Sequence, residues 1–258
     1  MSEGTAGEAP CELLAWDSEF FGRRIGRLHG RYRGRLDRAL LDDVERWRRE
    51  EAIDCLYLLA DGADSASAPL AEEAGFRLTD LRITLDRPLA ELAVDEPAAD
   101  PGDLTRIRPA LPDDLPELRR IAAASHRDSR FYADPRFGRA RCDELYATWI
   151  AASCRGEAAE AVLVAEVAGR PAGYITCLLR PAPGQPPYGQ IGLLAVGEAA
   201  QGRGMGGRLV QAALVWFAEQ GAAGVSVVTQ GRNERAQRLY QRLGLYTRAV
   251  EIWFHKWY

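Results

Sequence analysis

The sequence is poor in lysine and has no long apolar run. Lys256 is the only lysine in a chain whose formal net charge is −4. Nucleic acids and anionic membranes bind strongly basic surfaces, so we expect neither as a partner. No segment is apolar over the length that a membrane-spanning helix needs, and residues 1–10 lack the basic start and apolar core of a signal peptide. We therefore expect a soluble, cytoplasmic protein.

The sequence also has few cysteines, and their spacing excludes two common uses. The five cysteines are odd in number and scattered, and they include no C-x-x-C pair. A disulfide framework or a zinc site would need a different spacing, so we expect neither, and no bound metal. Hydrophobic residues make up 47% of the chain, which is enough for a sizeable core.

A glycine-rich stretch is the most informative feature that is present. Residues 201–206 read Gln-Gly-Arg-Gly-Met-Gly, after an apolar run at 191–196 and before a helical pattern at 207–220. A strand that passes through glycines into a helix leaves the first N–H groups of that helix without internal partners, and the helix dipole adds positive charge there. Glycine also lets a ligand approach the backbone closely. The stretch therefore predicts a phosphate or pyrophosphate site, with a plain strand-to-helix turn as the alternative.

The pattern of apolar residues divides the chain into two α/β parts. Pro, Ala and Asp are frequent at 88–104, which predicts a linker there, a small N-terminal domain at 1–87 and a second domain at 105–258. The second domain reads strand, two helices, three strands, helix, strand, helix and strand. This order is typical of a mixed sheet flanked by helices.

Several local predictions are specific enough to be checked. We expect a strand over 11–16, a turn at 20–22, loops at 126–137 and 181–187, and paired strands over 246–257. They rest on period-two apolar patterns for the strands and on glycine, proline and polar clusters for the turns.

The glycine-rich stretch resembles a signature of the GNAT superfamily of N-acetyltransferases. That family carries Gln/Arg-x-x-Gly-x-Gly/Ala between its central strand and a helix, and Gln201, Gly204 and Gly206 fill these positions. Residues 232–244 resemble its second signature, Asn-x-x-Ala-x-x-Leu-Tyr-x-x-x-Gly. The resemblance covers residues 105–258 and implies the α/β acyl-CoA N-acyltransferase fold, a mixed central sheet flanked by helices.

The N-terminal part resembles one group within this superfamily. Residues 14–22, Leu-Ala-Trp-Asp-Ser-Glu-Phe-Phe-Gly, resemble the opening of bacterial dTDP-fucosamine acetyltransferases, which carry a small extra domain before the GNAT domain. Residues 129–131 and 146–150 are also similar to that group. This resemblance implies direct transfer of acetyl to the amine of a nucleotide-linked amino sugar.

The resemblance implies acetyl-CoA as the acyl donor. Its pyrophosphate would bind the N–H groups of the glycine-rich stretch, and its pantetheine arm would bind the end of the preceding strand, which would splay from its neighbour at 224–229. The residues expected to bind this donor are Leu194, Ala195, Val196, Gln201, Gly202, Arg203, Gly204, Met205, Gly206, Gly207 and Asn233.

Tyr240 is the expected general acid and Asp80 the expected general base. Asn233 and Tyr240 lie two helical turns apart and so share a face, and a phenol is close enough in pKa to a thiol to protonate it. The family's usual acidic residue is missing, since Gly192 and Leu193 stand in its region, and Asp80 matches an acidic residue of the sugar-nucleotide group. The alternatives are a core position for Tyr240, a helix cap for Asn233 and a surface position for Asp80.

A polar and aromatic loop is expected to bind the acceptor. Arg130 would pair with a diphosphate and Phe131 would pack against a sugar or base. The alternative for Arg130 is a solvated surface position. His126, in the same loop, is a second candidate base, with an incidental loop position as its alternative.

Three functions remain open from the sequence. The first is the N-acetyltransferase acting on a sugar nucleotide, the second acts on a protein N-terminus or another small amine, and the third is a non-catalytic acetyl-CoA-binding module. Tyr240 next to Asn233 argues against the third. Aromatic residues near the C-terminus are expected to be exposed and to pair strands between the subunits of a homodimer: Trp253, Phe254, Trp257 and Tyr258.

Overall fold

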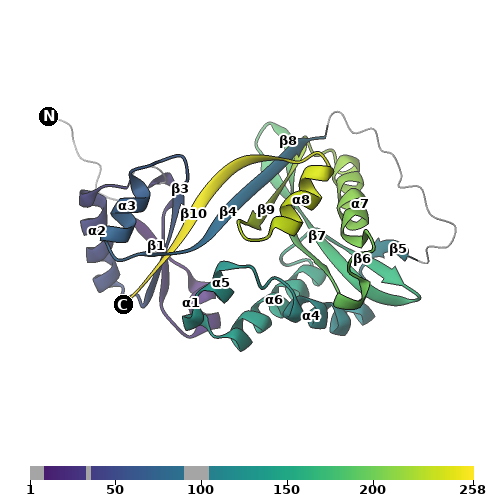
Figure 1. The fold of residues 1–258 in the computed structure, drawn as a ribbon, viewed down its shortest axis with the longest axis horizontal. Coiled ribbons are helices and arrows are strands. Elements are labelled where there is room, and N and C mark those ends of the chain that lie inside the picture. Colours follow the sequence, from purple (N-terminus) through teal and green to yellow (C-terminus); the bar gives the residue numbers. More distant parts are fainter. Residues whose placement is uncertain (1–8, 33–35, 90–104) are drawn as a thin grey trace. The chain divides into compact units, whose positions relative to one another are not determined.

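The structure, a computed structural model, describes residues 9–32, 36–89 and 105–258. It contains two compact units, one made of Met1–Arg82 with Ala249–Tyr258 and the other of Ile83–Arg248. These bounds differ from the predicted ones because two long strands, β4 (Arg77–Pro88) and β10 (Tyr246–Trp257), each contribute residues to both units (Figure 1). Of the predicted linker, residues 90–104 lie outside the described ranges.

The first unit is a small sheet with helices. Its elements, besides its shares of β4 and β10, are β1 Cys11–Leu13, α1 Ala15–Phe21, β2 Ile25–Leu28, α2 Arg38–Glu50, β3 Cys55–Asp61 and α3 Ser67–Glu73. β1 pairs antiparallel with β2, β2 pairs parallel with β3, and β3 pairs antiparallel with β10. The core packs Leu40 and Val44 of α2 against Leu56 and Leu58 of β3. The buried side chains of α2 therefore recur at helical spacing.

The second unit is a mixed sheet flanked by helices, as predicted. Its strands are ordered β4-β9-β8-β7-β6-β5. Its elements are β5 Thr105–Pro109, α4 Leu115–Ala124, α5 Arg130–Ala133, α6 Arg139–Cys154, β6 Ala161–Val167, β7 Arg170–Ala182, β8 Gln185–Val196, α7 Met205–Glu219, β9 Gly224–Gln230 and α8 Glu234–Arg242.

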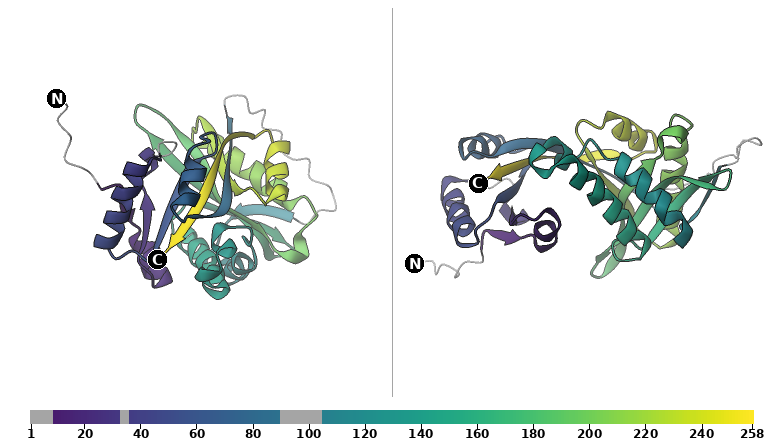
Figure 2. Two further views of the ribbon diagram at one scale, coloured as in Figure 1. Left: turned by 60° about the vertical axis from the view of Figure 1, so that its left-hand side comes forward. Right: turned by 90° about the horizontal axis from the view of Figure 1, so that it is seen from below.

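Helices cover both faces of this second sheet. α4 and α6 lie on one face, and α7 and α8 lie on the other (Figures 1 and 2). On the α7 face, Leu209 and Phe217 of the helix pack against Ile175 and Cys177 of β7 and Ile191 of β8. These strand residues alternate with residues that face α4 and α6, so both faces of β7 are buried. The central strands are therefore held from both sides, which fixes the end of β8 where the glycine-rich turn begins.

Three local predictions about residues 11–137 differ from the structure. The strand expected over 11–16 ends at Leu13, and α1 occupies the place of the expected turn at 20–22. α1 has no buried residue, so its apolar side chains do not follow the spacing of a core-facing helix. The loop expected at 126–137 contains the short helix α5.

The prediction for residues 181–187 was also wrong. The loop expected at 181–187 is mostly strand, because β7 continues to Ala182 and β8 begins at Gln185. The register shifts between Arg180 and Ala182, so the prolines of this hairpin stand where the ladder is irregular and an N–H donor can be missing.

The C-terminal segment forms one strand, β10, instead of the expected paired strands. It pairs with β3 from Glu251–Asp61 to Trp257–Cys55. Phe254 is fully buried and only Tyr258 of the four aromatic residues is exposed. The expected exposed aromatic surface is therefore absent from this described strand, and the homodimer stays a prediction without that support. Among the helices of the described ranges, none is long and apolar enough to cross a membrane.

Candidate active site

The glycine-rich stretch forms the turn between β8 and α7, as predicted. Gly202 and Gly204 have φ angles of 79° and 74°, in the left-handed region that favours glycine. Gly204 is also the N-cap of α7, so this helix begins without a capping side chain. A Cβ atom on Gly206 would lie 3.3 Å from Leu239 Cδ2, so glycine at 206 lets α8 pack closely against α7.

Five successive backbone N–H groups in this turn are left for a ligand. Among the residues that the structure describes, none accepts a hydrogen bond from an N–H group between Gly202 and Gly206. The next two N–H groups, of Gly207 and Arg208, donate to Gly204 O at 2.9 and 3.2 Å. The positive end of the α7 dipole lies at the same place. This arrangement fits a pyrophosphate.

The strand that precedes the turn separates from its neighbour, as predicted. Parallel pairs between β8 and β9 run from Tyr188–Gly224 to Ile191–Val227 and end there, although both strands continue. Residues 192–196 therefore face an open edge on the β9 side. An extended ligand with amide groups can hydrogen-bond to such an edge as an added strand does.

A β-bulge lies where β8 leaves β9. Thr176 of β7 stands opposite two residues of β8, Gly192 and Leu193, and accepts a hydrogen bond from Leu193 N at 2.7 Å. A Cβ atom on Gly192 would lie 2.7 Å from Thr176 Oγ1 and from Leu178 Cδ1, so only glycine fits. Because a bulge bends its strand, it accounts for the separation of the two strands.

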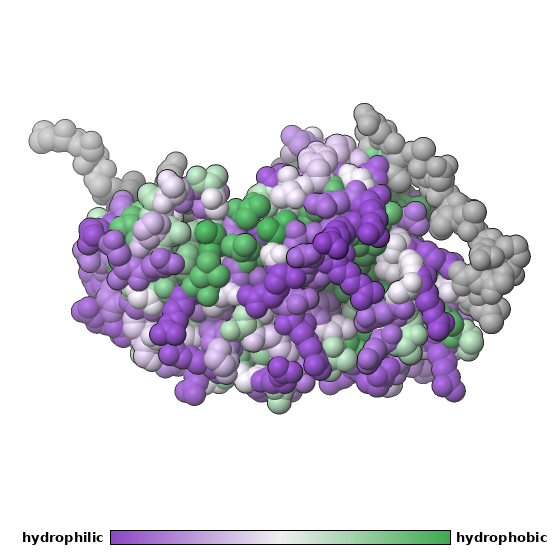
Figure 3. Space-filling view, in the orientation of Figure 1, coloured by the Kyte–Doolittle hydropathy of each residue, from purple (hydrophilic) through white to green (hydrophobic). Residues whose placement is uncertain are grey.

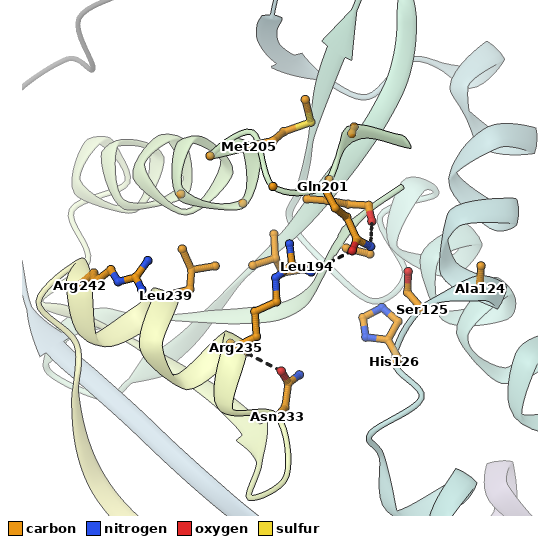
Figure 4. Close-up of a pocket in the computed structure, with 18 residues that line it drawn as sticks. Ala124, Ser125, His126, Leu194, Gln201, Met205, Asn233, Arg235, Leu239 and Arg242 are labelled. Atoms are coloured by element: carbon orange, nitrogen blue, oxygen red, sulfur yellow. Dashed lines mark hydrogen bonds between the residues drawn. The ribbon is translucent and has the colours of Figure 1, made fainter. Parts of the chain in front are cut away.

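The turn and the open strand end border a cavity of about 480 Å³ (Figure 4). Ten of the eleven residues expected to bind the donor line it, and Arg203 does not. The other walls come from the end of α4 and from α8. The lining residues are Ala124, Ser125, His126, Leu194, Ala195, Val196, Ala200, Gln201, Gly202, Gly204, Met205, Gly206, Gly207, Asn233, Arg235, Ala236, Leu239 and Arg242.

The charge of the cavity suits an anionic ligand. Arg235 and Arg242 line it, and its lining residues include no carboxylate. Arg235 Nη1 donates to Gln201 Oε1 at 2.8 Å, while Gln201 Nε2 donates to Val196 O at 3.0 Å. Figure 4 shows this arginine reaching from α8 toward the glycine-rich turn. No group of three His, Cys, Asp or Glu side chains that could hold a metal occurs in the described part of the chain.

Asn233 fits both roles that the sequence left open, binding of the donor and capping of a helix. Its side chain accepts a hydrogen bond from Ala236 N at 3.1 Å and so caps α8. It also lines the cavity, at the edge nearest β9. The capping contact uses the side-chain oxygen, which leaves the amide NH₂ as a donor on the cavity side.

Tyr240 lies on α8 and is 4% exposed, within the core that α7 and the sheet share. Burial raises the pKa of its phenol, which therefore stays protonated near neutral pH. Its side chain is not among those that line the cavity. Its role as general acid stays a prediction, and its protonation state is compatible with it.

The other three predicted residues do not line this cavity. Asp80 is buried in β4, in the part of that strand that belongs to the first unit. Phe131 is buried in α5, and its ring centre lies 5.5 and 6.2 Å from those of Phe137 and Trp149 in edge-on contacts. The guanidinium of Arg130 lies 4.2 Å from the ring centre of Phe131. The roles of all three stay predictions.

The structure places His126, the second candidate base, in the wall of the cavity. It follows the end of α4 and faces the same space as Leu194, Gln201 and Asn233 (Figure 4). This position favours a role in the site over an incidental loop position, the alternative considered for it. Its ring contacts come from α6 and β7, which are remote in sequence, so no local motif could have indicated this position.

Residues 118–245 match the Acetyltransferase (GNAT) family. Two curated relatives cover different shares of the chain. A dTDP-fucosamine acetyltransferase of Escherichia coli is 27% identical over 96% of this chain and 98% of its own length. A mycothiol acetyltransferase of Salinispora arenicola is 29% identical over 72% of this chain and 58% of its own length.

Solved structures show the same fold at low sequence identity. A GCN5-related N-acetyltransferase from Sphaerobacter thermophilus matches with a TM-score of 0.63 and 19% identity, over 96% of this chain and 76% of that one. Another from Kribbella flavida matches with a TM-score of 0.60 and 14% identity, over 99% of this chain and 90% of that one. The predicted GNAT fold is thereby confirmed. Together with the family match, these observations identify the chain as an acetyltransferase of the GNAT family.

Proposed function

We propose that this protein transfers an acetyl group from acetyl-CoA to the amine of a nucleotide-linked amino sugar. The donor half of the proposal is supported by the five available N–H groups at Gly202–Gly206 and by the open edge of β8. The acceptor half is supported by one observation, the similarity to a dTDP-fucosamine acetyltransferase along nearly the whole of both chains.

The chain's own residues divide the binding of the donor between them. The N–H groups of the turn and the dipole of α7 hold the pyrophosphate. Residues 194–196, whose backbone is unpaired on the β9 side, hydrogen-bond the amides of the pantetheine arm. Asn233 and Arg235 close the opposite wall from α8. With the pyrophosphate at the turn and the pantetheine arm along residues 194–196, the thioester would lie beyond residue 194, on the side of the bulge.

Proton transfer is assigned to two side chains. Tyr240 gives its proton to the sulfur that departs as the carbon–sulfur bond breaks and the carbon–nitrogen bond forms. Asp80 takes the proton that the amine loses, directly or through a water molecule. Both assignments rest on the sequence resemblance, and the buried, protonated phenol of Tyr240 supports the first of them.

A second acceptor has one observation in its favour. The chain is 29% identical to a mycothiol acetyltransferase over 72% of its own length, so the acceptor of those enzymes should be tested beside the sugar nucleotides. The similarity covers 58% of that relative, against 98% of the dTDP-fucosamine enzyme. The sugar nucleotide is therefore the better-supported acceptor.

An assay of thiol release from acetyl-CoA tests the proposal. The acceptors are a panel of dTDP- and UDP-amino sugars, the acceptor of the mycothiol acetyltransferases, peptides with free N-termini, and polyamines. We expect turnover with a sugar nucleotide and little with the others. Turnover of a peptide or polyamine without any sugar nucleotide would overturn the acceptor assignment, and binding of acetyl-CoA without turnover of any acceptor would support a non-catalytic module.

A further inference from the structure

The backbone at His126 has a conformation that few residues other than glycine adopt. Its φ angle is 59°, and it directly follows Ser125, the C-cap of α4. The N–H of Ser129 donates to His126 O at 3.2 Å and closes the turn. Histidine tolerates this region better than most side chains, and such conformations cluster at functional sites. Of the non-glycine residues with positive φ in the described ranges, His126 alone lines the cavity.

Two aromatic side chains fix the imidazole ring of His126. Its Nε2 lies 3.1 Å from the hydroxyl of Tyr174 on β7. Its ring stacks on Tyr146 of α6, with 4.5 Å between the ring centres and 18° between the planes. Tyr146 in turn stacks on Tyr132, whose hydroxyl donates to Asp143. The stacking contact and the hydrogen bond together fix the orientation of the His126 ring relative to a ligand in the cavity.

The hydrogen bond with Tyr174 determines which nitrogen of His126 carries the proton. Tyr174 is fully buried, and among the described residues His126 is the partner of its hydroxyl. If Nε2 donated, the phenol hydrogen would be buried without an acceptor, which is costly. Tyr174 therefore donates to Nε2, and the proton of the neutral ring is on Nδ1. No described residue accepts a hydrogen bond from this Nδ1–H.

Two observations argue against His126 as the general base. Desolvation lowers the pKa of the imidazole to about 4, so the ring is neutral at physiological pH and is a weak proton acceptor there. The nitrogen with a free electron pair, Nε2, is also the one that Tyr174 occupies. A neutral imidazole with a free N–H is instead suited to donate a hydrogen bond.

We propose that His126 donates its Nδ1–H to a carbonyl oxygen of the acyl donor that binds in the cavity. This inference rests on the proposed binding of acetyl-CoA there. The carbonyl belongs either to an amide of the pantetheine arm or to the thioester. Both offer the same acceptor chemistry, and the experiments below separate them. Tyr174 and Tyr146 act as positioning residues, since they hold the ring through contacts of their own.

Nitrogen NMR of the wild-type protein with labelled histidine tests the inference without any substitution. We expect the assigned His126 signals to show a neutral ring protonated at Nδ1, and the Nδ1–H signal to shift when the donor binds. A shift with coenzyme A and acetyl-CoA alike indicates a pantetheine carbonyl, and a shift with acetyl-CoA alone indicates the thioester. A charged ring, a proton on Nε2, or no shift with either ligand overturns the inference.

Two substitutions form a matched pair for kinetics. In His126→Asn the side-chain NH₂ lies near the former Nδ1, and asparagine tolerates the left-handed backbone. In His126→Gln the amide instead lies near the former Nε2. We expect His126→Gln to lower kcat/KM for acetyl-CoA about tenfold or more, the usual effect of losing one such hydrogen bond, and His126→Asn to lower it less than about threefold. Thermal unfolding checks that both variants are folded.

The outcomes separate this inference from the proposed function. If wild-type protein does not bind acetyl-CoA in calorimetry, the proposed function fails first. If wild-type protein binds and transfers acetyl but both variants match it, His126 is not a donor. Equal large losses in both folded variants, together with a changed pH dependence of kcat/KM, would indicate a base and also overturn the inference.

Discussion

The two helices that border the cavity begin in opposite ways. α8 starts at Asn233, whose side chain accepts a hydrogen bond from Ala236 N, whereas α7 starts at Gly204, which has no side chain to offer. α8 therefore closes its own N-terminus and presents side chains to the cavity. α7 leaves its first N–H groups open and presents backbone. The α8 wall can contact a ligand through side chains, and the α7 wall through backbone N–H groups that no side chain caps. Substitutions should therefore act differently on the two walls.

The largest effect is expected from Tyr240→Phe, a substitution on α8 that lies outside the cavity lining. Loss of a general acid lowers kcat by about 10²- to 10⁴-fold, whereas acetyl-CoA affinity should hardly change because Tyr240 does not line the cavity. Tyr246→Phe is the matched control, since Tyr246 is 55% exposed and also outside the cavity lining. Steady-state kinetics and calorimetry measure the two quantities. Wild-type turnover in Tyr240→Phe would remove this residue from the mechanism.

A carboxylate on the backbone wall should have the next largest effect. Gly204→Asp places a negative charge where the pyrophosphate binds, at the start of α7. Hydrogen bonds to charged groups contribute about 1.5–3 kcal/mol each, so losing two of them lowers acetyl-CoA affinity by about a hundredfold or more.

Two controls sharpen this comparison. Gly204→Asn has nearly the same size without the charge and should weaken binding less. Gly221→Asp places the same residue at the other end of α7, where φ is 70° and a Cβ atom meets nothing within 4 Å. It should leave affinity unchanged. Equal affinity in Gly204→Asp and wild type would show that the ligand does not use the start of α7.

A smaller effect is expected from Arg235→Gln. Arg235 lines the cavity and contacts Gln201, so its loss should weaken acetyl-CoA binding about three- to tenfold, and less at high salt because the interaction is partly exposed. Arg238→Gln is the control on the same helix, since Arg238 pairs with Glu234 and does not line the cavity. If both variants weaken binding equally, the effect is general charge and not a contact of Arg235.

The smallest effect on binding is expected from Asn233→Ala, and it should appear mainly in stability. Loss of the α8 cap lowers the free energy of unfolding by about 1 kcal/mol. Asp37→Ala is the control in the first unit, where Asp37 caps α2 by accepting a hydrogen bond from Leu40 N at 2.8 Å. Denaturant unfolding should show similar losses in both variants. Only Asn233→Ala should also weaken acetyl-CoA binding, by a few-fold, and equal affinity in both would reduce Asn233 to a cap.

The sequence predicted the backbone wall better than the rest of the site, for physical reasons. Gly202, Gly204 and Gly206 stand within one short segment, and the conformations they permit are local. His126 gained no such signal, because Tyr146 and Tyr174 reach it only through the packing of α6 and β7 against α4. The bulge at Gly192 depends on Thr176 and Leu178 of another strand and was likewise invisible.

In the fold, too, features set by local sequence were predicted better than features set by tertiary packing. α4, which buries one face, was predicted from the pattern of apolar residues in the second domain. α1 was missed because none of its residues is buried. Prolines in the hairpin of β7 and β8 suggested a loop, although an irregular register accommodates them. The sequence therefore predicted an element where burial of one face makes apolar residues recur at a regular spacing. It failed where no such spacing exists.

The most direct measurement is amide NMR of the glycine-rich turn with and without acetyl-CoA. We expect the N–H signals of Gly202–Gly206, which have no acceptor among the described residues, to shift strongly and to become protected from exchange when acetyl-CoA binds. The signals of the α8 start, where Ala236 N is already bonded to Asn233, should change less. Binding of acetyl-CoA that leaves the turn amides unshifted and unprotected would contradict binding of its pyrophosphate at the glycine-rich turn.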